Sequence, residues 1–185
     1  MGDYVGVAVV ASILTLAGVL AISVIGKVRS RMSFRAFADG IAQLRVAPVP
    51  WSRPVAVASI ASEVAVLALV LWPKGAVIGL AAAVLLFGAF TVVLARAVRQ
   101  GSTAGCHCFG PTDTPVAWRH VARSAFLAST AAGALLGAIT VPAISLRSLE
   151  PPHLILALSL AGFIVTTLVR LDDLTWLLRG ASHAR

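Results

Sequence analysis

The chain has 185 residues, of which 59% are hydrophobic and 12% are charged. Because a soluble domain carries about 25% charged residues, this composition excludes an ordinary water-soluble fold and favours a protein embedded in a bilayer. The formal net charge of +8 comes from 15 Lys and Arg residues against 7 Asp and Glu residues. These cations flank long apolar stretches, which is typical of membrane proteins, so no nucleic acid partner is expected.

A chain of this length has room for about four or five membrane spans of about 20 residues each, and for no separate soluble domain. We therefore predict an all-α fold: a polytopic membrane helical bundle with a four-helix core plus a fifth C-terminal transmembrane helix. One integral membrane domain then covers residues 1–185. The expected spans are about 4–25, 54–72, 76–95, 120–141 and 154–170, and the bilayer itself is the first expected partner.

The first span, residues 4–25, is uncharged and long enough to cross about 30 Å of hydrocarbon. No Lys or Arg precedes it, whereas Lys27, Arg29 and Arg31 follow it. A secretory signal peptide has the opposite order of charge. The pattern therefore predicts an uncleaved span whose N-terminus lies outside the cell.

A short amphipathic helix is predicted over residues 32–46. Phe34, Phe37, Ile41 and Leu44 recur at three- and four-residue intervals, with polar residues between them. The segment is too short and too charged to cross a membrane. It either lies along the membrane interface or folds back onto the bundle, and the sequence does not separate these alternatives.

The second span, residues 54–72, contains Glu63 near its middle. An acidic side chain at the bilayer centre costs roughly 2.5 to 3.5 kcal/mol on insertion scales, so Glu63 must be protonated, paired or placed in a polar cavity. It either holds helices together by hydrogen bonding or carries a proton. Lys27 is a candidate partner, but it lies at the end of the first span, at a shallower depth than Glu63.

The glycine pairs Gly75/Gly79 and Gly133/Gly137 predict close helix packing.

The charge distribution orients the chain, which has a polar loop over residues 96–118. All Lys and Arg residues except Lys74 and Arg147 fall on one side of the predicted spans. The positive-inside rule makes that side cytoplasmic, so the protein is expected in the cell membrane with the 96–118 loop and the C-terminus in the cytoplasm.

The candidate reactive segment is Gly105-Cys106-His107-Cys108-Phe109-Gly110, which holds the only two cysteines of the chain. Packing alone does not explain such a pair in a chain without other cysteines. A disulfide between Cys106 and Cys108 would close a small, strained and easily reduced ring. Arg99 and Arg123, and the N-terminal end of the following helix, would favour the thiolate that a nucleophilic cysteine needs.

Two alternatives use the same segment. Cys106, His107 and Cys108 offer two thiolates and an imidazole, which would suit Cu or Zn, although no fourth ligand is evident. The loop could also be inert, which would make the chain a non-catalytic membrane partner subunit. Whether the protein is an enzyme, namely a thiol–disulfide oxidoreductase, therefore stays open. A quinone cofactor would fit such a helical bundle, although no residue of the sequence requires one.

The order of several motifs resembles the methylamine utilisation protein E (MauE) family, within the DoxX-like membrane proteins. The similarity covers roughly residues 10–140. The similar residues are Gly26-Lys27, Phe34, Phe37, Glu63, Phe90, the segment from Gly105 to Gly110, Trp118-Arg119 and Ala122-Arg123. Two positions differ from the expected pattern: His107 replaces a small residue, usually Gly, and Ser124 replaces Asn.

The resemblance implies a membrane redox protein that supports disulfide formation or maturation of an exported partner, beside a thioredoxin-like protein. Cys106 and Cys108 would be the redox pair, with Glu63, Arg123 and Arg99 as assisting residues. Disulfides form outside the cytoplasm, whereas the charge distribution places this pair inside. Two outcomes would reconcile these arguments: the thiols pass electrons across the membrane, with the loop dipping into the bundle, or the orientation is inverted. We keep the orientation that the charge distribution predicts.

Overall fold

The computed structural model describes residues 2–44, 46–102, 116–140 and 151–182, and within them it contains helices and no strand. The helices are α1 (Gly2–Val28), α2 (Arg31–Gln43), the 3₁₀ turn η1 (Val49–Trp51), α3 (Ser52–Leu71), α4 (Ala76–Arg99), α5 (Trp118–Thr140) and α6 (Pro151–Ser182). All except α2 and η1 are long and apolar enough to span a membrane. The predicted fold class, an all-α polytopic membrane bundle, is confirmed.

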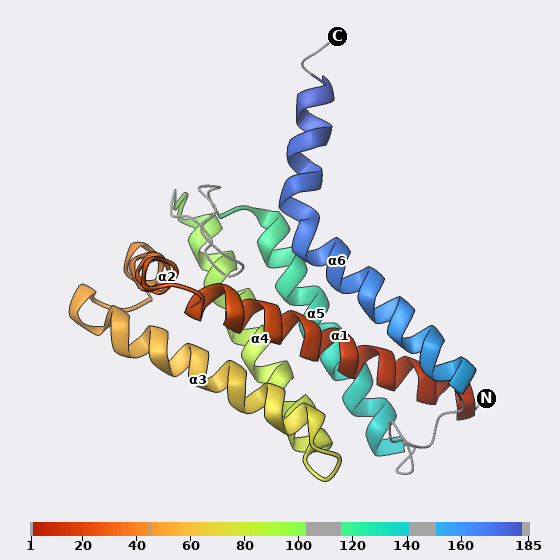
Figure 1. Cartoon of the computed structure of the whole chain (residues 1–185). Coiled ribbons are helices and arrows are strands. Elements are labelled where there is room, and N and C mark those ends of the chain that lie inside the picture. The colour runs from red at the N-terminus through yellow and green to blue at the C-terminus, as the bar shows by residue number, and fades with distance from the viewer. Residues whose placement is uncertain (1, 45, 103–115, 141–150, 183–185) are drawn as a thin grey trace.

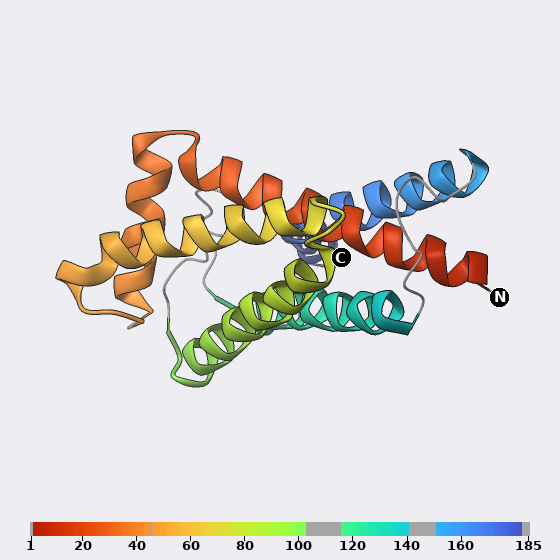
Figure 2. The same cartoon turned by 90° about the horizontal axis from the view of Figure 1, so that it is seen from below.

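Helix α1 forms the centre of the bundle. In its most apolar stretch 61% of the residues are buried, against 28% or less in each of the other four spans. Leu16, Val19 and Leu20 lie in the main core with residues of α3, α4 and α5. An apolar helix can be enclosed by neighbours in this way because it has no polar face to keep outside. Figure 2 shows α4 and α5 in one layer, with α1, α3 and the first half of α6 in the other.

The spans alternate in direction, so their ends gather at two poles (Figure 1). One pole holds the end of α1, all of α2, the start of α3, the end of α4 and the start of α5. Arg53, Arg96 and Arg119 belong to these helix ends, whereas Lys74 lies in the turn between α3 and α4 at the other pole. The chain therefore separates its charge as the sequence predicted, while the side of the membrane on which each pole lies stays a prediction.

Helix α2 folds back against the first turns of α3. The Ser30 hydroxyl caps its N-terminus by accepting a hydrogen bond of 3.0 Å from the backbone N–H of Ser33. Its apolar face is covered, because Ala38 and Ile41 form a small core with Ala56 of α3. This contact corresponds to the second of the two alternatives for this segment, a helix packed on the bundle.

The structure confirms close packing at the pair Gly75/Gly79, and at Gly137 but not Gly133 of the second pair. A Cβ atom on Gly79 would lie 2.6 Å from the backbone nitrogen of Val70, so α3 and α4 approach as closely as they do because Gly79 has no side chain. A Cβ on Gly137 would meet Val9 of α1 at 2.6 Å. Gly133 has open space around it, so the expectation of close approach there is wrong.

Replacing Gly79 by Ala should therefore destabilise the bundle by about 1 to 3 kcal/mol, because the clash is with backbone atoms that have little room to move. Gly88 is the matched control, since it lies in the same helix and no atom would lie within 4 Å of its Cβ. Gly88→Ala should be neutral or slightly stabilising. Thermal unfolding of the detergent-purified variants measures both effects, and equal unfolding temperatures for the two would contradict the predicted close contact.

Candidate functional site

A buried ion pair joins α1 to α3. Lys27, in the last turn of α1, pairs through its Nζ with Oε1 of Glu63, and the two side chains are 1% and 0% exposed. Ser23 donates a hydrogen bond of 3.2 Å to the other carboxylate oxygen, Oε2. Ser23 and Lys27 are four residues apart and therefore share one face of α1, so both carboxylate oxygens are bound by the same helix.

The stagger of the helices brings Lys27 to the depth of Glu63. Figure 2 shows that α3 begins well beyond the end of α1, so that the end of α1 lies beside the middle of α3. Positions along the two predicted spans suggest that Lys27 lies shallower than Glu63. The offset between the two helices, which the sequence does not predict, makes the expected pairing direct.

Two aromatic rings complete the surroundings of the ammonium group. Nζ of Lys27 lies 4.6 Å from the ring centroid of Phe37 on α2 and 5.8 Å from that of Phe90 on α4. Both distances are within the range of a cation–π attraction, which is stronger where water is excluded. Lys27 thus contacts α2, α3 and α4 while belonging to α1.

Helix α5 supplies the remaining polar wall. Arg123 and Ser124 are buried, and they line one small cavity together with Ser23, Lys27 and Glu63. The cavity has a volume of about 20 Å³, close to the size of one water molecule. Lys27 and Arg123 therefore bring two basic side chains to the wall of a cavity that also holds the carboxyl group of Glu63.

The structure brings together two of the predicted site residues and separates a third from them. Glu63 and Arg123 line the same cavity, and Arg123 also donates a hydrogen bond of 3.4 Å to the carbonyl of Leu168 on α6. Arg99 is exposed on the last turn of α4 and does not line this cavity. Ser23 is a site residue that the sequence-based predictions do not include, although its four-residue spacing from Lys27 indicates it.

The cysteine segment lies outside the described residues, including Cys106, His107 and Cys108. The residues beside it are well packed: Leu94 and Ala97 in the last turns of α4 form a small core with Val116, just before α5, and Val121 in the first turn of α5. His120 accepts a hydrogen bond of 3.1 Å at Nδ1 from the backbone N–H of Ala117. Both attachment points of the segment are therefore held together, at the same pole as Lys27 (Figure 1).

The metal alternative is not tested by this geometry. In the ranges that the structure describes, no group of three or more His, Cys, Asp or Glu side chains is placed to hold a metal ion. The proposed ligands Cys106, His107 and Cys108 are not among them, so Cu or Zn binding there stays a prediction.

The fold and the site together define a multi-pass helical membrane protein with a charged pair enclosed in its bundle. The chain belongs to the methylamine utilisation protein MauE family, whose model matches residues 5–139. The match runs from α1 into the last turn of α5 and includes Lys27, Glu63, Arg123 and both cysteines. The sequence-based family assignment is confirmed. No curated protein and no solved structure matches the chain.

Removing one partner of the ion pair should be far more harmful than removing both. Lys27→Met or Glu63→Met alone leaves an uncompensated buried charge and should cost about 3 to 5 kcal/mol, whereas the double variant should regain most of that loss. Thermal unfolding in detergent, analysed as a double-mutant cycle, measures the coupling.

Lys74→Met is the control for the loss of a lysine, because Lys74 is exposed in the α3–α4 turn. It should change stability by less than about 0.5 kcal/mol. Additive effects of Lys27→Met and Glu63→Met in the double variant would show that the two side chains do not stabilise each other.

Proposed function

We propose that this protein is a membrane thiol–disulfide redox protein that supports disulfide formation or maturation of an exported partner. Cys106 and Cys108 are its redox pair. The observation that carries the proposal is the placement of these two cysteines, the only ones in the chain, in the segment between α4 and α5. That segment leads directly into the helix that carries Arg123 to the buried Lys27–Glu63 pair.

The chemistry is a thiol–disulfide exchange in which the partner disulfide is the oxidant and takes up the two electrons that the cysteine pair loses. One thiolate of the pair attacks a sulfur of a partner disulfide and releases one partner thiolate, which takes up a proton. The second cysteine then loses its proton and attacks the mixed disulfide, which releases the second partner sulfur as a thiolate that takes up a proton. The products are a Cys106–Cys108 disulfide and a reduced partner, and the reverse sequence oxidises the partner. A thioredoxin-like protein is the expected exchange partner, and the exported protein is the final client.

The charged residues near the segment have distinct roles in this proposal. Arg99 and Arg123 favour the thiolate form by their positive charge. Glu63 exchanges a proton inside the bundle, and Lys27 holds its carboxylate in place. The presence of Lys27 and Arg123 in one cavity wall supports these roles, because basic side chains stabilise negative charge that forms nearby.

The reactivity of both thiols toward maleimide should depend on whether the membranes are first oxidised or reduced. Alkylation with a mass-tagged maleimide after oxidation or reduction should label both cysteines in the reduced protein and neither in the oxidised protein. In Cys106→Ser and in Cys108→Ser the remaining cysteine should be labelled after oxidation as well, because it cannot form the Cys106–Cys108 disulfide. Equal labelling of both thiols under all conditions would contradict the exchange reaction. Near-stoichiometric Cu or Zn that is lost in His107→Gly would support the metal-binding alternative instead.

The contribution of Arg99 can be separated from the general charge of its helix end. Arg99→Gln should slow iodoacetamide alkylation of the reduced thiols by roughly threefold to tenfold, because a neighbouring cation raises the thiolate fraction. Arg96→Gln is the matched control, since Arg96 is also exposed in the last turn of α4. Identical rates in both variants would remove Arg99 from the proposed site.

The proposed orientation places the N-terminus outside and the cysteine segment in the cytoplasm. Because the chain has only two cysteines, a membrane-impermeant maleimide applied to intact cells reports their side directly. No labelling of intact cells and full labelling of inverted membrane vesicles is the expected result. Labelling of intact cells would show that the orientation is inverted, which would leave the exchange chemistry in place on the outer side.

A further inference from the structure

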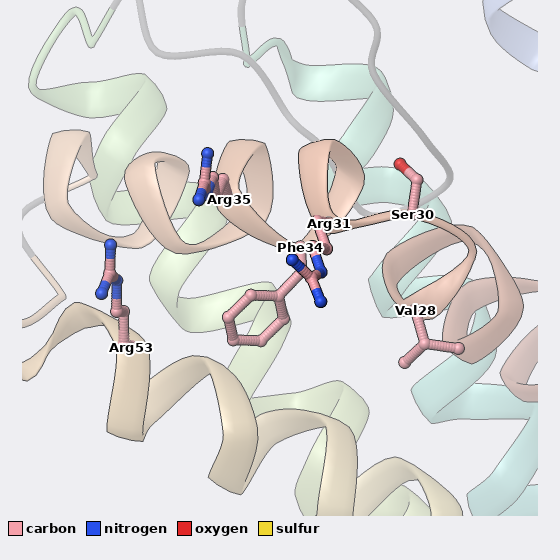
Figure 3. A pocket seen from close by; sticks show the side chains of 6 residues that line it. All are labelled: Val28, Ser30, Arg31, Phe34, Arg35 and Arg53. Atoms are coloured by element: carbon pink, nitrogen blue, oxygen red, sulfur yellow. The ribbon is translucent and has the colours of Figure 1, made fainter.

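A second cavity, separate from the polar site, opens at the pole that carries most of the positive charge. Its volume is about 380 Å³. It is lined by Val28 at the end of α1, Ser30 in the following connection, Arg31, Phe34 and Arg35 on α2, and Arg53 on α3 (Figure 3). It shares no lining residue with the cavity at Lys27 and Glu63.

Three arginines line this cavity, and none of them forms a salt bridge with a carboxylate in the part of the chain that the structure describes. The nearest acid in the sequence, Asp39, is exposed four residues after Arg35 and does not line the cavity. Arg31 and Arg35 are four residues apart and thus lie on one face of α2. Like charges gathered in this way repel one another, and a bound anion would relieve the repulsion.

The start of α2 adds a second attraction for an anion. The 13-residue helix begins at Arg31, directly after the capping residue Ser30, and its first turn contains no acidic residue. The partial positive charge at this helix end is therefore not balanced by an acidic side chain in that turn. Figure 3 shows Arg53 pointing from α3 toward α2, so cationic groups of both helices face the same space.

The apolar part of the lining and the position indicate which anion fits. Phe34 points from α2 toward α3, and Val28, which lines the same cavity from the end of α1, is 55% exposed. These side chains lie where the spans α1 and α3 end or begin, which is the level of the lipid headgroups. A guanidinium group binds a phosphate through two parallel hydrogen bonds. Basic pockets beside membrane-spanning helices recognise anionic headgroups in the same way.

We propose that the cavity between α2 and α3, lined by Arg31, Arg35 and Arg53, binds the phosphate group of an anionic phospholipid. The lipid bridges the two helices through the arginines of α2 and α3, while Val28 and Phe34 contact the apolar region below the phosphate. Binding of this lipid therefore stabilises the packing of α2 on α3.

The test compares lipid binding to the full chain in zwitterionic phosphatidylcholine nanodiscs that contain increasing amounts of phosphatidylglycerol. Native mass spectrometry of the released protein should show retained phosphatidylglycerol on the wild type. The double variant Arg31→Gln/Arg53→Gln should bind it at least about tenfold more weakly. Phosphatidylglycerol should also raise the unfolding temperature of the wild type more than that of this variant.

The matched control is Arg29→Gln/Arg96→Gln, which removes the same charge from exposed positions outside the cavity. It should retain phosphatidylglycerol as the wild type does. Equal loss in both double variants would overturn the proposal in favour of unspecific charge attraction, and equal retention of phosphatidylcholine would overturn the selectivity for anionic lipid. Displacement of the lipid by millimolar inorganic phosphate would identify a site for small anions instead.

Discussion

The architecture depends on one buried electrostatic contact, the ion pair between Lys27 and Glu63. Taking both charges out of water costs several kcal/mol per ion, and this cost is offset only where the remaining hydrogen-bonding capacity is also satisfied. Here Ser23 binds the second carboxylate oxygen, while Phe37 and Phe90 face the ammonium group. The contact joins the end of α1 to α3, and Phe37 brings α2 against the same ammonium group.

The cysteine segment and the ion pair are connected through α5. Val116 and Val121 pack against the end of α4, so the start of α5 is anchored where the segment ends. Within its second turn the same helix places Arg123 and Ser124 in the wall of the polar cavity. A change of charge at the proposed thiols would therefore act on a helix that lines the same cavity as the buried pair. The hydrogen bond from Arg123 to Leu168 extends this connection to α6.

The sequence alone predicts the helices well and their mutual placement poorly. Uncharged stretches of about 20 residues indicate spans directly, since the bilayer sets their length, and the motif order indicated the family. The pairing of Lys27 with Glu63 depends on how far α3 slides along α1, which no local pattern encodes. For the same reason Gly79 and Gly133, which have similar surroundings in sequence, differ completely in their contacts. Arg123 and Arg99 likewise looked equivalent, yet one is buried in the polar cavity and the other is exposed.

The order of the two charged residues along the chain bears on how the protein enters the membrane during synthesis. Lys27 precedes Glu63 by 36 residues, so the ribosome delivers the ammonium group before the carboxylate. The cation that pairs with Glu63 therefore belongs to the span that is made before α3. Pairing with it offsets the insertion cost of Glu63 within one chain, without a partner protein.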